Sequence, residues 1–298
     1  MSNYLQPVYL TSFSIPDAWF EALGMLVKNE DKCNIYAVDF GSAGKTVRED
    51  GTVEPGLLRY ERDFTSIHIL NPGMRPLHPI IPDGLGIPPV TTVQKIEDYF
   101  ATYILHPGKA ENEDYSYGER ICISVEEVCR KYREQGFGQN QCTIEIAKPE
   151  DIFLDSPPCC RSIDTKISKC RETGVYRLHF YIYFRSWNLW GGFPENLGGM
   201  QLLKEWMVKQ IGDHPDGTPL VDGEMIVSSK SLNVREDVFE LVKKRLYISN
   251  ADVVQEVNYL SDMGSSEGID YLRRCGVEVE RYIEDAFIKE NPDEGVIE

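Results

Sequence analysis

Three side chains between residues 157 and 197 have types and spacing that suit chemistry on a nucleotide. Cys159 follows the rigid Pro157-Pro158 turn, Arg185 ends a long apolar run, and Asn196 stands eleven residues after that arginine. A thiolate is a strong nucleophile, and a nearby guanidinium lowers the pKa of a thiol. Arginine binds phosphate through paired hydrogen bonds, and an asparagine amide offers a donor and an acceptor to a heterocyclic base. The segment therefore predicts a nucleotide enzyme that uses covalent catalysis.

Each of the three residues also has a simpler interpretation. A lone buried cysteine such as Cys159 is more often structural than catalytic. Arg185 could form an ordinary surface ion pair, and Asn196 could cap a helix. The physical signal alone leaves these alternatives open.

The elements that must position these residues alternate irregularly along the chain. Apolar periodicity, capping residues and β-rich runs predict strands and helices without a strict strand-helix repeat. The predicted strands are Ile35–Phe40, Thr143–Ala147 and Tyr176–Phe184. Two helices are predicted from their first residues: one starts at Ser14 and another at the capping box Ser124–Glu127. Four more are predicted over Val93–Tyr103, Leu197–Val208, Val234–Leu246 and Ser266–Lys289. This order favours an α+β fold, and because no linker stands out, we expect a single domain over residues 1–298.

Composition excludes several classes of protein. The formal net charge is −17, which disfavours binding to nucleic acid or to an anionic membrane. No segment approaches the about 20 apolar residues that span a bilayer, and the N-terminus does not resemble a signal peptide. We therefore expect a cytoplasmic protein. The eight cysteines include no C-x-x-C pair, so they are expected to be free thiols. The cluster of Cys159, Cys160, Cys170 and His179 lacks paired metal-ligand spacing, so no metal is expected.

Several ordered motifs together resemble the family of thymidylate synthases and pyrimidine-nucleotide hydroxymethylases. The resemblance is firmest at Pro158-Cys159, Arg185-Ser186 and Asn196-Leu197, which match the family's nucleophile, its Arg-Ser-x-Asp strand end and its Asn-(Ile/Leu) pair. It extends over about residues 90–245. The looser matches are Glu97, Tyr117-Gly118, Asn140-Gln141 and Pro149–Ile152.

The resemblance implies a thymidylate-synthase-like domain, a mixed β-sheet with helices packed on it, that forms a homodimer. It also implies a pyrimidine nucleoside monophosphate as substrate and 5,10-methylenetetrahydrofolate as the one-carbon donor. Cys159 would add to C6 of the base, Arg185 would bind the phosphate, and Glu97 and Tyr117 would relay the C5 proton through water. Hydride from the folate then gives a methyl group, whereas water gives a hydroxymethyl group.

Departures from the family pattern concern the sugar and the phosphate. Asn188 stands where the family has an acid, and Asn233 and Arg235 align with the His-x-Tyr pair that holds deoxyribose. Asn140-Gln141 replaces the arginine pair that reaches the partner subunit's phosphate. Phosphate binding would then depend on Arg185 with further cations.

The candidate further cations are Lys45, Arg48 and Arg161. The turn Gly41–Lys45 lacks the phosphate-loop pattern of nucleotide triphosphatases, so it is either the family's phosphate-binding loop or a plain hairpin turn.

Further departures concern the base and the access of water. Glu195, next to the base-reading Asn196, could accept a hydrogen bond from a cytosine amino group, or could simply favour a helix N-terminus. The tryptophan that walls off the reactive intermediate has no counterpart between Glu97 and Tyr117. These departures are similar to those of CMP 5-hydroxymethylases of nucleoside-antibiotic pathways such as that of mildiomycin.

The resulting expectation is a folate-dependent C5 hydroxymethylase of CMP or dCMP. The substrate-binding set would be Arg185, Ser186, Asn188, Asn196, Glu195, Lys45, Arg48, Asn233 and Arg235. The alternatives are a thymidylate synthase, a dUMP hydroxymethylase, or a family member that binds nucleotide without turnover.

Overall fold

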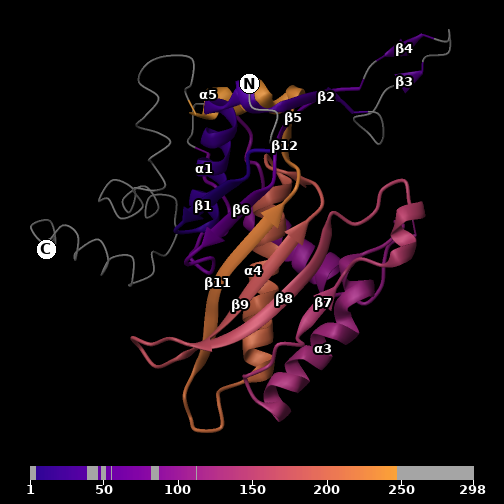
Figure 1. Ribbon diagram of the computed structural model, residues 1–298. Coiled ribbons are helices and arrows are strands. Elements are labelled where there is room, and N and C mark those ends of the chain that lie inside the picture. Colours follow the sequence, from indigo (N-terminus) through magenta and orange to yellow (C-terminus); the bar gives the residue numbers. More distant parts are fainter. Residues whose placement is uncertain are drawn as a thin grey trace, which may run out of the picture.

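The computed structural model describes residues 5–38, 46–47, 52–54, 56–81, 87–111 and 113–246 (Figure 1). Lys45 and Arg48, with the expected glycine-rich turn Gly41–Lys45 and the expected helix Ser266–Lys289, lie outside these residues. Within the described ranges, no helix is long and apolar enough to cross a membrane.

A six-stranded mixed sheet forms the centre of the fold. Its strands, in spatial order, are β1 (Val8–Ser12), β6 (Thr65–Ile69), β11 (Leu220–Ser229), β9 (Tyr176–Phe184), β8 (Cys160–Lys169) and β7 (Thr143–Glu145). β1 pairs with β6 and β11 with β9 in parallel, and the other neighbours are antiparallel. This mixture of strand directions, with helices, confirms the predicted α+β class. The prediction of β9 is confirmed residue for residue, whereas β7 ends two residues earlier than expected.

A second sheet lies beside the first and ends near the candidate site. Its order is β10 (Trp187–Asn188), β12 (Leu232–Arg235), β5 (Leu58–Arg62) and β2 (Asn34–Ala37). The short strands β3 (Thr46–Val47) and β4 (Val53–Glu54) pair with each other. In the parallel pair of β10 with β12, Asn188 is the register partner of Asn233. Distant parts of the sequence therefore meet at this point.

The helices are α1 (Ile15–Lys28), α2 (Val93–Asp98), α3 (Tyr117–Gln135), α4 (Gly192–Ile211) and α5 (Glu236–Leu246), with a π-helix at Tyr99–Ile104 and 3-10 turns at Glu30–Lys32 and Pro149–Phe153. Ser14 caps α1 as predicted, because its side chain accepts from the backbone N–H of Asp17. The helix start predicted at Ser124 is wrong. α3 begins at Tyr117, where the Ser116 side chain accepts from the N–H of Glu119 and provides an earlier cap.

The helix predicted from Val234 also begins later than expected. Val234 lies in β12, where it pairs with Tyr60 of β5, and α5 starts at Glu236. Sheet pairing therefore takes precedence over helical periodicity at this junction.

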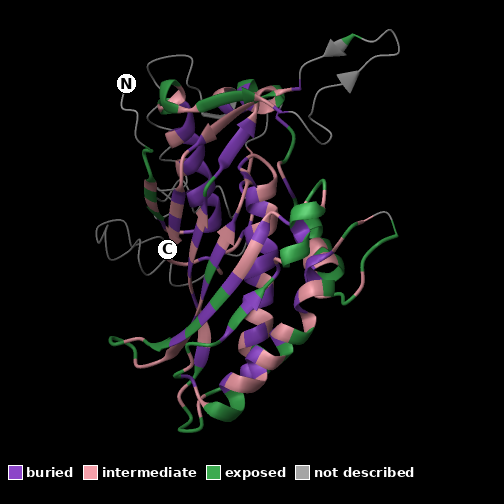
Figure 2. Cartoon of the chain, turned by 45° about the vertical axis from the view of Figure 1, so that its right-hand side comes forward, coloured by how far each residue is buried: buried purple, intermediate pink, exposed green. Residues whose placement is uncertain are grey.

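Helices α1, α3 and α4 pack on one face of the six-stranded sheet, with the core between them and the sheet, whereas α5 packs on β5 and β12 of the second sheet (Figures 1 and 2). Along β9, every second residue from Leu178 to Phe184 is buried, whereas Tyr181 between them is 38% exposed. One sheet face is therefore sealed by helices, and the other is open in the described part of the chain. The candidate site lies at the end of β9 that carries Phe184.

Candidate active site

Cys159 and Arg185 lie side by side because two antiparallel strands begin and end there. Cys159 directly precedes β8, Arg185 directly follows β9, and Cys160 is the register partner of Phe184. The backbone N–H of Arg185 donates to the carbonyl oxygen of Cys159 at 2.8 Å. Cys160 is fully buried, whereas Cys159 is partly exposed, as expected for adjacent residues that face opposite sides of a strand. Sheet hydrogen bonding thus sets the spacing of the expected nucleophile and the expected phosphate ligand.

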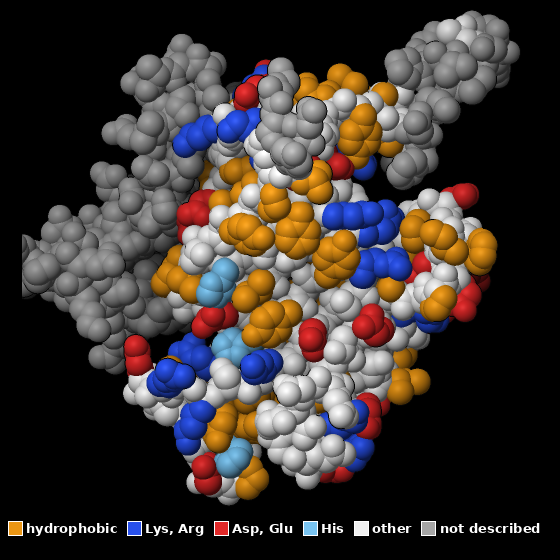
Figure 3. Space-filling view, viewed as in Figure 1, with side chains coloured by type: hydrophobic (Ala, Val, Ile, Leu, Met, Phe, Trp, Pro, Cys, Tyr) orange, Lys and Arg blue, Asp and Glu red, His pale blue; other side chains and the backbone are white. Residues whose placement is uncertain are grey.

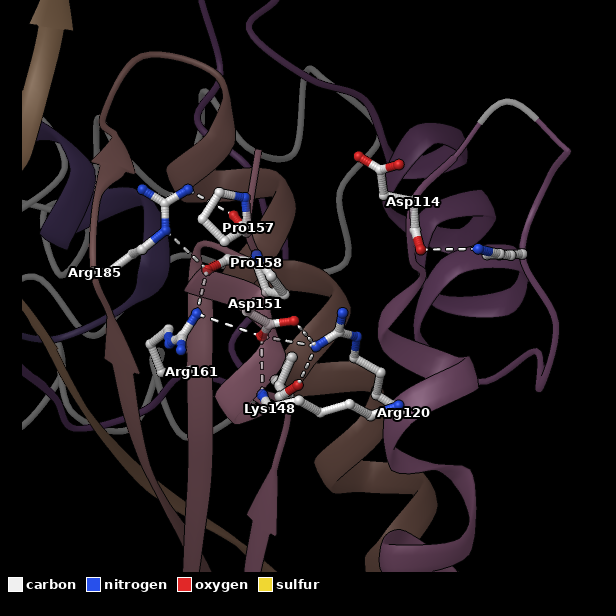
Figure 4. A network of polar contacts seen from close by, with 10 residues as sticks. Asp114, Arg120, Lys148, Asp151, Pro157, Pro158, Arg161 and Arg185 are labelled. Atoms are coloured by element: carbon white, nitrogen blue, oxygen red, sulfur yellow. Dashed lines mark hydrogen bonds and ion pairs between the residues drawn. The ribbon is translucent and has the colours of Figure 1, made fainter. Parts of the chain in front are cut away.

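The guanidinium of Arg185 holds the Pro157-Pro158 turn. Its Nε donates to the carbonyl oxygen of Pro158 at 3.1 Å and its Nη2 to that of Pro157 at 2.6 Å (Figure 4). Nη1 makes no hydrogen bond with any described residue. Arg185 therefore orients the segment before Cys159 and still has an amino group for an anion. Among the described residues it has no carboxylate partner, in contrast to the surface ion pair of the simpler interpretation.

A buried ion network supports the same turn from below. Asp151, 2% exposed, pairs with Arg120 at 2.7 Å and lies 3.6 Å from Arg161, whose Nη1 also donates to the Pro158 carbonyl (Figure 4). Burial opposes the charge of Asp151, but the N–H of Lys148 and the two arginines outweigh it, so the pKa of Asp151 lies below its usual value. Two cations surround one anion, which leaves net positive charge beneath the turn.

Tyrosine side chains form the wall next to Cys159. The Tyr117 hydroxyl accepts from the backbone N–H of Cys160 at 3.1 Å, which places Tyr117 against the start of β8. The Tyr103 and Tyr117 ring centroids are 5.0 Å apart, and those of Tyr115 and Tyr117 are 6.2 Å apart. A thiolate at Cys159 raises the pKa of all three hydroxyls, after the larger effect of burial. The cluster is therefore close enough to the thiol for direct electrostatic contact.

Asn196 is held in one orientation by two aromatic side chains. Its Nδ2 donates to the Tyr99 hydroxyl at 3.0 Å, and its Oδ1 accepts from Trp187 Nε1 at 3.3 Å. Asn196 is not the cap of α4, because Gly191 occupies that position and Asn196 lies inside the helix. The neighbouring Glu195 accepts a 3.3 Å hydrogen bond from Thr91 Oγ1.

Ser186 and Asn233 are brought together by the second sheet, and Asn188 lies beside them. Asn233 is 2% exposed and donates from Nδ2 to Ser186 Oγ at 3.3 Å, while Asn188 Oδ1 accepts from the N–H of Gly191. Arg235 makes an ion pair with Asp237 at 2.8 Å, so its guanidinium is already engaged. The polar residues predicted to hold the sugar therefore converge, and Arg235 stands apart from them in its contacts.

Glu97 has no contact that places it in the site. It is exposed on α2 and makes no hydrogen bond or ion pair with the described residues. Its predicted role in proton relay stays a prediction, as do the roles of Lys45 and Arg48. In the described part of the chain, no group of three His, Cys, Asp or Glu side chains could hold a metal ion.

The sequence does not indicate two residues of this site, Tyr99 and Tyr103, as contacts of the functional side chains, whereas Trp187, expected either to line the ligand site or to pack under it, contacts Asn196. The apolar periodicity of the sequence predicts Tyr99 and Tyr103 on one face of a helix. Their four-residue spacing within a π-helix stacks the two rings, with centroids 5.4 Å apart, toward Tyr117. The unusual density of tyrosine between residues 99 and 117 was the available signal.

A polar pocket of about 610 Å³ lies away from this site, at the opposite end of β9. Its walls include Arg75, Arg177, Glu205 and Asp222. Because Arg177 and Arg185 stand near opposite ends of one strand, the pocket is not continuous with the thiol site.

Comparison with known proteins gives distant similarity to one group. Curated relatives named "Putative thymidylate synthase" include those of Methanosarcina mazei, 26% identical over 128 residues, and Methanosarcina acetivorans, 27% identical over 128 residues. Each match covers 41% of this chain and 56% of the relative. A relative from Methanococcoides burtonii is 24% identical over 157 residues, which cover 51% of this chain and 66% of the relative. The chain thus spans little more than half the length of the first relatives it matches.

No family model matches the chain. The distant relatives nevertheless support the thymidylate synthase family, in agreement with the motif resemblance.

Proposed function

We propose that this protein is a folate-dependent one-carbon transferase that hydroxymethylates C5 of a pyrimidine nucleoside monophosphate, with CMP or dCMP as substrate. One observation carries the proposal: a partly exposed Cys159 lies beside Arg185, whose guanidinium anchors the turn before the thiol and keeps Nη1 free among the described residues. The Tyr117 hydroxyl and the oriented amide of Asn196 lie in the same region. Together with Cys159 and Arg185 they supply a thiol, a cation, a hydroxyl and an amide that can read a base.

In the proposed reaction, the Cys159 thiolate adds to C6 of the base while Arg185 binds the phosphate. The new C6–S bond makes C5 a carbon nucleophile. 5,10-Methylenetetrahydrofolate, when bound, supplies the one-carbon unit, and the tyrosine rings beside Cys159 form an aromatic cluster against which a pterin ring can pack. The Tyr117 hydroxyl accepts from Cys160, so its own proton remains available to a water molecule near C5.

The sugar and base preferences follow from the polar residues around Asn196. Asn188 and Asn233 present amides, which suit the two hydroxyls of a ribose as well as the single hydroxyl of deoxyribose. Glu195, held by Thr91 next to Asn196, supplies an acceptor for a cytosine amino group. The Glu195 acceptor supports a cytosine base over uracil, and the amides are compatible with either sugar.

The decisive experiment supplies CMP, dCMP, UMP and dUMP, each with methylenetetrahydrofolate, and identifies the products by mass. A hydroxymethylated cytosine nucleotide, without formation of dihydrofolate, is the expected result. A methylated dUMP with stoichiometric dihydrofolate would instead establish a thymidylate synthase, and a hydroxymethylated dUMP would move the proposal to uracil. If none of the four nucleotides reacts but one of them binds, the chain is a nucleotide-binding relative without turnover.

The same proposal includes a homodimer in the cytoplasm. The sheet face opposite the helices has no described helix over it, and it exposes 75% of Tyr9 and 38% of Tyr181. Figure 3 shows hydrophobic side chains gathered at the centre of this face, with charged and histidine side chains below them. Such a face suits self-association. Sedimentation analysis of the full chain should show a dimer, and a monomer at micromolar concentration would contradict this part of the proposal.

A further inference from the structure

The side-chain amide of Asn196 is bonded at its oxygen by a group that can only donate. Trp187 Nε1 donates to Asn196 Oδ1 at 3.3 Å, and Asn196 Nδ2 donates to the Tyr99 hydroxyl at 3.0 Å. An indole N–H has no acceptor capacity, so it can bond the oxygen of an amide but not its nitrogen. A phenol hydroxyl both donates and accepts, so Tyr99 suits either end of the amide. Of the two partners, Trp187 therefore decides which way the amide faces.

Trp187 is itself placed firmly by its surroundings. Its ring lies between the rings of Phe184 and Phe193, with centroids 4.5 and 4.3 Å away, and the residue is 2% exposed. Its backbone N–H donates to the Ser231 carbonyl oxygen at 2.8 Å, beside the pairing of β10 with β12. Because protein interiors are close-packed, this indole cannot turn away from Asn196 without opening the core. The donor that fixes the amide thus belongs to the core.

The amide keeps one donor and one acceptor for a ligand. Asn196 makes no other hydrogen bond with the described residues, so the second N–H of Nδ2 and the second lone pair of Oδ1 remain available. Gly192, one turn earlier in α4, leaves space beside them. A Cβ at Gly192 would lie 3.7 Å from Asn196 Oδ1 and 3.5 Å from Asn188 Cβ, with no other described side chain within 4 Å.

Ring contacts connect this amide to the region of the expected nucleophile. The Tyr99 ring meets the Tyr117 ring edge-on, with centroids 6.5 Å apart, and the Tyr117 hydroxyl accepts from the Cys160 N–H. On the other side, Trp187 stacks on Phe184, which is the register partner of Cys160. The amide is therefore linked from two sides to the start of β8, directly after the thiol.

Cytosine and uracil require opposite directions of such an amide. Uracil offers the N3–H donor and the O4 acceptor, whereas cytosine offers the N3 acceptor and the N4 amino donor. A side-chain amide can bond both positions of either base, but its oxygen and nitrogen must exchange places between the two. An amide that is free to turn binds both bases, whereas a fixed amide binds one base and leaves polar groups unpaired with the other.

We propose that Trp187 is a positioning residue that fixes the direction of the Asn196 amide and so enforces the choice between cytosine and uracil. This inference rests on the proposed function, in which Asn196 contacts the base and Glu195 favours cytosine. To accept the other base, Asn196 would have to turn Nδ2 towards Trp187 Nε1, and two donors would then face each other. Tyr99 does not oppose this turn, because its hydroxyl can donate instead of accept.

The test is the base selectivity of Trp187→Phe, which removes the indole N–H and keeps an aromatic ring in the stack. Calorimetry without folate measures the Kd of CMP against UMP and of dCMP against dUMP, so the result does not depend on turnover. The wild-type protein should prefer the cytosine nucleotide of each pair. In Trp187→Phe the ratio of the uracil Kd to the cytosine Kd should fall about tenfold, because the turned amide no longer leaves a buried donor unpaired. Most of the fall should come from tighter binding of the uracil nucleotide, a gain that a loss of packing does not produce.

Three controls separate the donor from the packing of the ring. Phe193→Leu removes one stacked ring but keeps the indole N–H, so the Kd ratio should stay within about twofold of the wild-type value. Tyr99→Phe should weaken both nucleotides by a similar factor and keep the ratio. In an Asn196→Ala background, Trp187→Phe should cause no further change in the ratio, because the indole acts through the amide. If Trp187→Phe does not fold, benzothienylalanine at position 187, with sulfur in place of the N–H and a nearly identical shape, tests the same inference.

Each outcome bears on the inference or on the proposed function. An unchanged Kd ratio in folded Trp187→Phe overturns the inference and leaves the proposed function intact, and so does an equal fall in Phe193→Leu. A wild-type protein that binds both bases equally also overturns it. If the wild-type protein prefers uracil and Trp187→Phe loses that preference, the inference holds and the cytosine assignment of the proposed function fails. If none of the four nucleotides binds, both fail.

Discussion

Replacing Arg185 by glutamine should weaken binding of a nucleoside monophosphate much more than binding of the corresponding nucleoside. In the structure, Nε and Nη2 donate to Pro158 and Pro157 at 3.1 and 2.6 Å, so Nη1 is the group left for a phosphate. A hydrogen bond to a charged group contributes about 1.5–3 kcal/mol, which corresponds to about a 10- to 150-fold rise in Kd. Titration calorimetry with both ligands measures the difference directly.

The nucleoside comparison separates two roles of Arg185. If the arginine only holds the Pro-Pro turn, the substitution should weaken nucleoside and nucleotide binding by the same factor. Arg177→Gln is the matched control, because Arg177 stands near the other end of the same strand, away from the thiol. An equal loss for both ligands, or no loss for the nucleotide, would refute the phosphate role.

Three further predictions concern the nucleophile, a buried amine and a close backbone contact. Cys159→Ser should abolish turnover but keep nucleotide binding in calorimetry; retained turnover would exclude covalent catalysis at this residue. Burial lowers the pKa of Lys204 to about 7, so from pH 7 towards 10 the unfolded chain binds one more proton than the folded chain. In urea titrations, the free energy of unfolding of the wild-type protein should therefore rise by about 1 kcal/mol per pH unit relative to Lys204→Met, and parallel pH profiles would contradict this. Gly118→Ala should lower the free energy of unfolding by about 1–3 kcal/mol, because the added Cβ would lie 1.9 Å from the His106 carbonyl oxygen. The control Gly138→Ala, which has open space around its Cβ, should change the free energy of unfolding little. Equal effects of the two substitutions would argue against the close contact at Gly118.

Predictions from the sequence were most accurate for elements whose structure depends on a single physical requirement. The strand Tyr176–Phe184 has the predicted bounds because its closely spaced aromatic and aliphatic residues are typical of a buried strand. The thiol, Arg185 and Tyr117 were predicted from motif spacing, and the structure brings them together. The start of α3 was not predicted correctly, because Ser116 and Ser124 both precede a glutamate at capping distance and only packing selects between them.

The tyrosine wall could not be predicted because it depends on a local change of helix type. Tyr99 and Tyr103 appear on a core-facing stripe if the helix is regular, but the π-helix at Tyr99–Ile104 turns the same residues towards Tyr117 and Asn196. Likewise, the neighbouring positions of Asn188 and Asn233 depend on parallel pairing of two short strands far apart in sequence. Neither arrangement leaves a periodic signal.

The turn of the β8–β9 hairpin lies at the opposite end of the two strands from Cys159 and Arg185. The turn is therefore a place where the protein can be modified. It is closed by the Cys170 N–H on the Val175 carbonyl, and residues 171–173 are exposed. The nine residues of β9, at about 3.3 Å each, place that turn about 30 Å from Arg185. A peptide tag, a surface tether or new chain termini introduced at residues 171–173 should therefore leave the thiol undisturbed, so the protein could be immobilised or made to carry a fluorescent reporter through this turn.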